Sequence, residues 1–141
     1  MKKDETLNPY IGPIGSNEKL MNFIEDTIVL LDARLINIDI NLIHNTSSFG
    51  NMSATLLFEP RHHTYQGLLK IYFNNLKQFD LCWEDKIFYY YIDRYKLRKT
   101  EKGHYALSID PYDEEGPITD EDSGIFISEE IHGEIIERNK I

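Results

Sequence analysis

The clearest pattern in the chain is a strict alternation of apolar and polar residues over positions 36–42. Aliphatic side chains are separated there by single polar ones: Ile36, Asn37, Ile38, Asp39, Ile40, Asn41 and Leu42. Successive side chains of a strand point to opposite faces, so a period of two predicts a half-buried β-strand. A polar segment at 44–51 follows and is typical of a turn or loop.

Further short strands are predicted along the rest of the chain. They lie near 52–59, 67–73, 78–84, 86–99, 104–110 and 124–131. Turn-forming residues separate them, namely Pro60, Asn74-Asn75, Glu84-Asp85, Lys102-Gly103 and the stretch 111–124. Short strands joined in this way indicate an antiparallel meander.

The N-terminal region has a different pattern. Residues 1–15 contain Pro9, Gly12, Pro13 and Gly15, which break any regular period and predict a flexible arm. Ser16 or Asn17 is placed to cap a short helix. Its apolar face has three-and-four spacing and comprises Leu20, Phe23, Ile24, Thr27 and Ile28. The end of the helix stays open, because Ile28-Val29-Leu30-Leu31 could equally begin a strand.

These patterns predict an α+β fold that is mainly β. We expect an antiparallel meander sheet of about six to eight strands with one short N-terminal helix. With 141 residues, of which 41% are hydrophobic, the chain suits one domain with a sizeable core. The predicted organisation is an arm at 1–15 and a single β-rich domain at 16–141, with an acidic loop at 110–124.

Composition also bears on the compartment. The single cysteine, Cys82, excludes an intrachain disulfide, and no run reaches the roughly 18 apolar residues of a membrane helix. The expectation is a cytoplasmic protein without a membrane partner.

Charge is distributed very unevenly. Residues 1–104 hold thirteen Lys or Arg and thirteen Asp or Glu, whereas residues 105–141 hold two and eleven, so the net charge of −9 lies in the last quarter. Seven carboxylates fall within residues 110–122. Such asymmetry favours a surface that meets a basic partner, and it argues against nucleic acid as the main ligand.

No pattern of catalytic, cofactor-binding or metal-binding residues is present. The five histidines lack metal-ligand spacing, and Cys82 lies between Asp80 and Glu84, which would raise rather than lower a thiol pKa. The acid-rich stretch lacks the alternate-position ligands of a calcium loop. The chain is therefore predicted to be a binding protein, not an enzyme, with no cofactor.

Bases and aromatics are interleaved over residues 86–102, and three interpretations stay open. The segment can stack on nucleic acid, form a protein interface, or pair its bases with the acidic tail of the same molecule. The third is the simplest, although an exposed ion pair is worth only about 0 to 1 kcal/mol.

Three segments together carry a resemblance to a known class of proteins. They are Leu31-Asp32-Ala33-Arg34-Leu35-Ile36-Asn37-Ile38-Asp39, Leu69-Lys70-Ile71-Tyr72-Phe73-Asn74-Asn75-Leu76 and Leu107-Ser108-Ile109-Asp110-Pro111-Tyr112-Asp113-Glu114. The chain resembles, over residues 26–136, the immunity proteins of polymorphic or contact-dependent bacterial toxin systems. That resemblance implies a cytoplasmic protein that binds and neutralises one cognate toxin.

The acidic loop is the predicted contact with a basic toxin domain. Its candidate binding residues are Asp110, Tyr112, Asp113, Glu114, Glu115, Asp120, Glu121 and Asp122. Carboxylates there would imitate the phosphates of a nuclease toxin's substrate, with Tyr112 as an aromatic anchor. The alternative is a structural domain whose acidic tail serves solubility, and which self-associates weakly as a homodimer.

Overall fold

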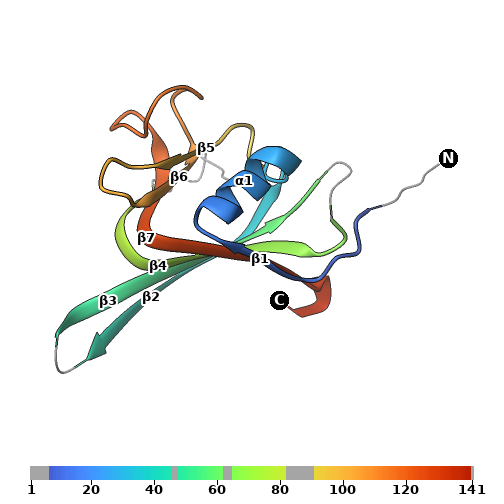
Figure 1. The fold of residues 1–141 in the computed structure, drawn as a ribbon, viewed down its shortest axis with the longest axis horizontal. Helices are drawn as coiled ribbons and strands as arrows, with labels where there is room; N and C mark the ends of the chain where they lie inside the picture. The colour runs from blue at the N-terminus through green and yellow to red at the C-terminus, as the bar shows by residue number, and fades with distance from the viewer. Residues whose placement is uncertain (1–6, 46–47, 62–64, 82–90, 141) are drawn as a thin grey trace.

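A computed structural model of the protein describes residues 7–45, 48–61, 65–81 and 91–140 (Figure 1). Its elements, in chain order, are β1 (Gly12–Ser16), α1 (Glu18–Thr27), β2 (Arg34–Asn45), β3 (Ser48–Glu59), β4 (Leu68–Asp80), β5 (Lys96–Lys99), β6 (Tyr105–Asp110), β7 (Ser123–Ile136) and the 3₁₀ turn Arg138–Lys140. The predicted fold class, α+β and mainly β with an antiparallel sheet and one short N-terminal helix, is confirmed.

The sheet is built from two meanders that meet in the middle. Its strand order is β2-β3-β4-β7-β6-β5, and every pairing is antiparallel. β4 and β7 pair from Leu68–Ile136 to Asp80–Ile125, so the long last strand joins β2-β3-β4 to β5-β6. β1 pairs with the far end of β7 beyond β6. The topology is therefore not the single uninterrupted meander that the turn spacing suggests.

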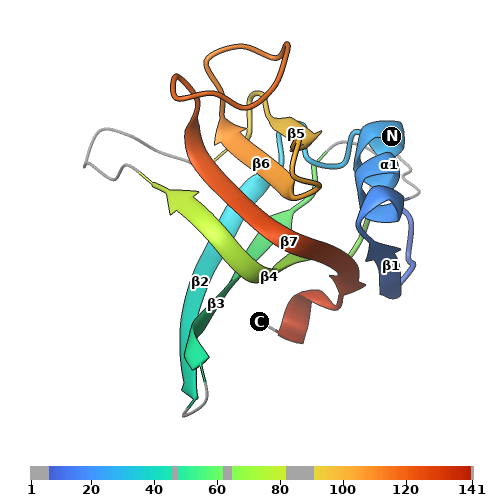
Figure 2. The same cartoon turned by 60° about the vertical axis from the view of Figure 1, so that its left-hand side comes forward.

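Helix α1 lies against one face of the sheet and closes the core there (Figures 1 and 2). Its residues Leu20 and Ile24 are buried, four positions apart on one side of the helix. They join a single cluster with aliphatic and aromatic side chains from β3, β4, β6 and β7, which include Phe58, Phe73, Leu107, Phe126 and Ile131. The core is thus a layer between one helix and one curved sheet.

The Asn74-Asn75 pair does not separate two strands, as the sequence suggests. The predicted strands at 67–73 and 78–84 are one strand up to Asp80, and β4 continues through the pair with a bulge between Leu76 and Gln78. Asn75 has a φ of 56°, a left-handed conformation that asparagine tolerates better than most residues. The pair bends β4 without ending it.

The N-terminal arm is also shorter than predicted. Gly12–Ser16 form β1, and the backbone N–H of Asn17 donates to the carbonyl of Ile131 over 2.8 Å. The side chain of Asn17 accepts a 3.0 Å hydrogen bond from the N–H of Ile131 and makes none to the helix. Asn17 therefore ties the start of α1 to β7 instead of capping the helix.

The remaining strand boundaries follow the sequence in part. Of the predicted strand at 86–99, Lys96–Lys99 form β5 and 91–95 are irregular apart from a bridge at Tyr91. Residues 86–90 lie outside the described residues. Ile28, predicted on the apolar helix face, is 54% exposed with a φ of 53°. The helix ends at Thr27, so its period no longer places Ile28 against the core.

Packing of α1 on β7 requires a glycine at position 133. A β-carbon there would lie 2.7 Å from Cδ1 of Leu20, closer than two carbons approach in a packed core. We expect Gly133→Ala to lower the free energy of unfolding by about 1–3 kcal/mol through overpacking. Urea denaturation followed by circular dichroism measures this.

The double variant Gly133→Ala, Leu20→Ala is its control. Truncating Leu20 makes room for the new methyl group, so the loss of stability in the double variant should be smaller than the sum of the two single losses. Strictly additive losses would show that the two positions do not collide.

Candidate partner-binding loop

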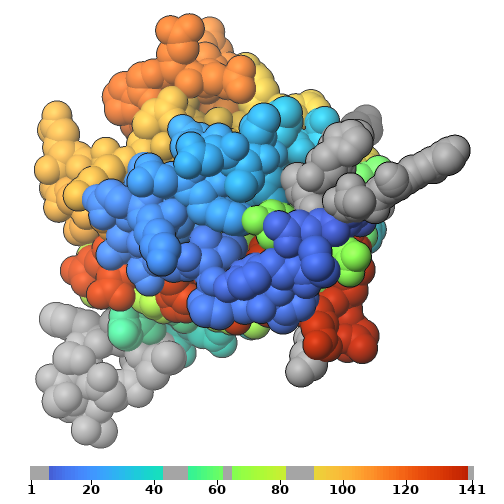
Figure 3. Space-filling model, turned by 45° about the vertical axis from the view of Figure 1, so that its right-hand side comes forward, coloured from blue at the N-terminus to red at the C-terminus, as the bar shows by residue number. Residues whose placement is uncertain are grey.

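The acidic loop joins β6 to β7 and stands out from the body of the protein (Figure 3). Its fold is set by local polar contacts instead of helix or strand. Oδ1 of Asp113 accepts from the N–H of Glu115 at 3.2 Å, and Oγ1 of Thr119 accepts from the N–H of Glu121 at 3.3 Å. Such side-chain-to-backbone turns are typical of Asp and Thr in irregular segments.

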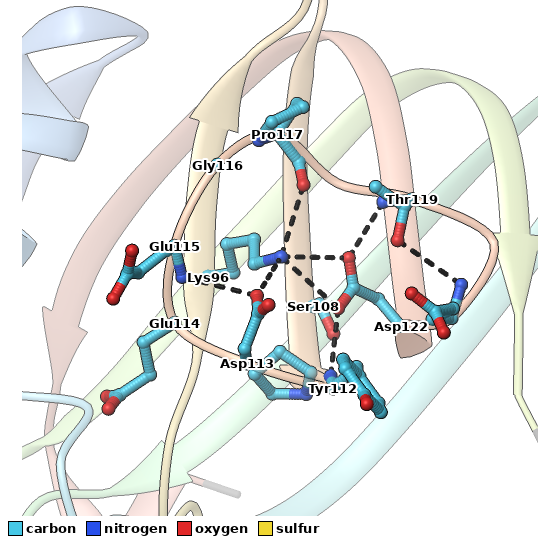
Figure 4. A network of polar contacts seen from close by, with 12 residues as sticks. Lys96, Ser108, Tyr112, Asp113, Glu114, Glu115, Gly116, Pro117, Thr119 and Asp122 are labelled. Carbon is cyan, nitrogen blue, oxygen red and sulfur yellow. Dashed lines mark hydrogen bonds and ion pairs between the residues drawn. The ribbon is translucent and has the colours of Figure 1, made fainter.

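Lys96 on β5 is the centre of the network that holds the loop in place (Figure 4). Its side chain is only 1% exposed. The ammonium donates to Oδ1 of Asp113 and the carbonyl of Pro117, both at 3.1 Å, and to the Asp122 carboxylate, with Oδ2 at 3.1 Å. An ammonium has three protons, so three loop residues satisfy it completely.

Asp122 is the buried counter-charge of this ammonium. Besides Lys96, its carboxylate accepts hydrogen bonds from the backbone N–H of Tyr112 at 2.9 Å and of Thr119 at 2.7 Å. It therefore fastens both ends of the loop to one point. A buried ion pair stabilises a protein only when the remaining lone pairs of the carboxylate are also hydrogen-bonded, as they are here.

The pKa values of the pair reflect this environment. Burial alone would raise the pKa of Asp122, but the N–H groups of Thr119 and Tyr112 and the Lys96 ammonium outweigh it and lower that pKa. Burial likewise opposes charging of Lys96, yet its contacts with Asp113 and Asp122 raise the pKa of Lys96. Both groups are charged at neutral pH.

Two arginines hold the loop backbone from outside. Nη2 of Arg94 donates to the carbonyl of Pro111 at 3.0 Å, while Arg98 donates to the carbonyls of Gly116 at 2.9 Å and Glu114 at 2.8 Å. Internal charge pairing with the acidic tail is therefore seen for Lys96 but not for these two arginines. Arg94 and Arg98 bind carbonyl oxygens of the loop, whereas Lys96 pairs with carboxylates.

The predicted binding residues therefore divide into two groups. Six side chains are exposed and form no ion pair with any described residue: Asp110, Tyr112, Glu114, Glu115, Asp120 and Glu121. The ring of Tyr112 is 64% exposed. Asp113 is exposed but paired with Lys96. Asp122 is 3% exposed, so its prediction as a contact residue is wrong. Its carboxylate is hydrogen-bonded inside the molecule, to Lys96 and to two backbone N–H groups of the loop.

Sequence reasoning did not single out Lys96 as the anchor. In β5 both Lys96 and its neighbour Leu97 are buried, on opposite faces, so alternation of polar and apolar residues fails at this position. One signal was available: seven carboxylates in a short loop leave little chance that a nearby strand lysine stays unpaired. Which carboxylate would turn inward depends on the loop's path and is not readable from composition.

A cleft lies beside the loop, between the β5–β6 turn and β4. Its basic lining includes Lys77, Lys99 and Lys102. Two of these cations are already paired, Lys77 with Glu129 at 3.2 Å and Lys99 with Glu18 at 2.6 Å, and the Lys99 contact helps to lower the pKa of Glu18 to about 2. The cleft is therefore weakly basic, and the strongest uncompensated charge of the region belongs to the loop acids.

Within the described ranges, no group of three or more His, Cys, Asp or Glu side chains is arranged to hold a metal ion. No helix among those residues is long and apolar enough to cross a bilayer. Cys82 and the pair His62-His63 lie outside the described residues.

Removing the charge of Asp122 tests the anchor. We expect Asp122→Asn to lower the free energy of unfolding by about 3–5 kcal/mol at neutral pH, because the buried ammonium loses its main counter-charge. The matched control is Asp120→Asn, an exposed acid two residues away, which should change stability by less than about 0.5 kcal/mol. Chemical denaturation of both variants measures the difference.

The pH dependence of that difference has a fixed sign. The folded pKa of Asp122 lies below its ordinary value of 3.8, so its stabilisation is complete above that pH and is lost as pH falls through the folded pKa. The gap between wild type and Asp122→Asn should therefore be constant from neutral pH down to about 4 and close in stronger acid. A gap that closes already near pH 6 would contradict the assignment.

Comparisons with known proteins give the chain no family. No family model, curated protein or solved structure matches it.

Proposed function

We propose that this protein is an immunity protein that binds a basic bacterial toxin domain through its acidic loop and neutralises it in the cytoplasm. One observation carries the proposal: the loop is fixed to the body by its backbone and by Asp113 and Asp122, while its other five carboxylates are exposed. A solubilising tail needs charge but no such fixing. A recognition surface benefits from the charge and from the fixed conformation of the loop.

Fixing the loop lowers the cost of binding. A flexible loop loses conformational freedom when a partner orders it, and this loss subtracts from affinity. Here, Arg94, Lys96 and Arg98 already hold the loop backbone. The loop loses this conformational freedom when the protein folds, so a partner binds carboxylates whose positions are already restricted.

The uncompensated charge supplies the attraction. Asp110, Glu114, Glu115, Asp120 and Glu121 place five carboxylates on one protruding loop. A basic surface is steered toward such a patch and selected by it, an effect on association rate and specificity more than on affinity. Tyr112 adds an exposed ring, and tyrosine is enriched among residues that dominate binding energy.

The mechanism that fits this surface is stoichiometric occlusion. The loop would enter or cover a basic active site that recognises an anionic substrate, and the bulk of the sheet behind it would exclude that substrate. No reaction is required of the protein itself.

The competing function is a structural domain whose acidic tail only solvates it. One form of this alternative, self-association between the bases at 94–98 and a neighbour's acidic tail, is weakened because Arg94, Lys96 and Arg98 are hydrogen-bonded within their own molecule. The solvation alternative predicts no specific partner. A capture experiment therefore distinguishes the two.

Purified protein is used as bait in lysate of the source organism at low salt, with elution by increasing salt. We expect one basic protein to be retained at one-to-one stoichiometry and released as salt screens the contact. Once identified, it is titrated against a variant in which Asp110, Glu114, Glu115, Asp120 and Glu121 become Asn or Gln. Affinity and its salt dependence should both fall.

The control variant neutralises five exposed acids elsewhere: Asp26, Asp80, Asp93, Glu101 and Glu130. Both variants change the net charge from −9 to −4, so they differ only in where charge is removed. Equal loss in the two variants would mean that overall charge, not the loop, attracts the partner. Retention of no partner at all would favour the solvating domain.

A further inference from the structure

The cleft beside the acidic loop lies on the outer face of the sheet. Two residues that line it, Arg98 and Ile127, are both register partners of Ala106, so these three side chains share one face. The next row across the same strands contains Leu107 and Phe126, which belong to the core. Because successive residues of a strand point to opposite faces, the cleft opens on the face away from the core.

The acidic loop covers part of this face, and the cleft begins where that cover ends. The loop crosses β5 in the close view, where the ammonium of Lys96 donates to the carbonyl of Pro117 (Figure 4). Ser108, the register partner of Lys96, is fully buried there. Ile127 on β7 and Ile118 in the loop are only half-buried, and both line the cleft. Part of its lining is therefore apolar.

The cleft has the size of a small-molecule site and a charge opposite to that of the whole protein. Its volume is about 660 Å³, within the range of about 300–1,000 Å³ typical of ligand pockets. The described residues that line it include four Lys or Arg and one Glu, although the chain carries 15 Lys or Arg and 24 Asp or Glu. This local reversal of sign favours an anionic ligand.

Two of these four cations have no carboxylate partner among the described residues. Lys77 and Lys99 are paired with acids, as described above. Arg98 donates only to backbone carbonyls, one of its own strand and two of the loop. Lys102 is exposed and makes no hydrogen bond or ion pair with a described residue. Against Glu101, these two cations leave the lining with one net positive charge when histidine is neutral.

We propose that this cleft binds a small organic carboxylate, a single carboxylate group carried on an apolar body. The carboxylate contacts Arg98 and Lys102. The apolar body lies against Ile118 and Ile127, whose exposed surface is then removed from water.

The donors of the cleft select this class of ligand. A guanidinium presents a planar fork of N–H groups that matches a carboxylate, and an ammonium beside it adds a further donor. Three of the five N–H groups of Arg98 donate to carbonyls, so two are left for a ligand. One negative charge balances the excess in the lining. A polyanion is disfavoured, because the exposed carboxylates of the acidic loop lie beside the cleft.

The experiment is an NMR titration of the isotope-labelled full chain with naphthoate at neutral pH and low salt. We expect saturable shifts in backbone signals of the cleft, including those of Arg98, Lys102 and Ile127. Two other compounds separate the parts of the ligand: naphthamide keeps the apolar body without the charge, and acetate keeps the charge without the body. Each should bind at least about tenfold more weakly than naphthoate.

Lys102→Gln removes one cation from the cleft and should weaken naphthoate binding about fivefold. Lys19→Gln, the same charge change at an exposed position of α1 outside the lining, is the matched control and should leave binding unchanged. Both positions are exposed, so both variants should fold.

Three outcomes would overturn the carboxylate site. They are an absence of saturable shifts in the cleft, naphthamide binding as tight as naphthoate binding, and an equal response to Lys102→Gln and Lys19→Gln. None of them bears on toxin capture, which rests on the loop carboxylates, so the two proposals fail independently.

Discussion

Burial of one ammonium group, that of Lys96, is the constraint on which the arrangement of β5 and the β6–β7 loop depends. A charge withdrawn from water must be matched by acceptors at hydrogen-bond distance, because isolated burial of a charge costs far more than a domain's stability. Lys96 finds its acceptors only in the loop between β6 and β7. The path of that loop and the positions of Asp113 and Asp122 follow from this, and the remaining carboxylates are left exposed.

β7 transmits this arrangement to the rest of the fold. The acidic loop leads into the first residues of β7, and the strand pairs with β4 and β6. Its C-terminal part pairs with β1 and is hydrogen-bonded to Asn17 at the start of α1. One strand therefore connects the helix, both meanders and the loop. The sheet needs no closure, since the helix covers the core face that the strands leave open.

The spacing of apolar residues along the chain predicted the elements that depend on local sequence. The alternation at 36–42 is strand β2, and the three-and-four spacing after Asn17 is α1. The Asn74-Asn75 pair led to a wrong strand boundary because asparagine suits both a turn and a bulge. Only the pairing of β4 with β7 decides between the two. The acidic loop was located from charge alone. The burial of Lys96 and Asp122 was not, because it results from contact between segments 26 residues apart.

The division of labour within the loop has a consequence for how recognition can change. Residues that determine the loop's shape, Lys96 and Asp122, are enclosed, whereas the side chains of Glu114, Glu115, Asp120 and Glu121 are exposed and form no ion pair with any described residue. The exposed positions can therefore accept other side chains without loss of the scaffold, as surface substitutions generally do. The same frame could thus be adapted from one partner to another by exchange of a few solvent-facing residues, with stability held constant.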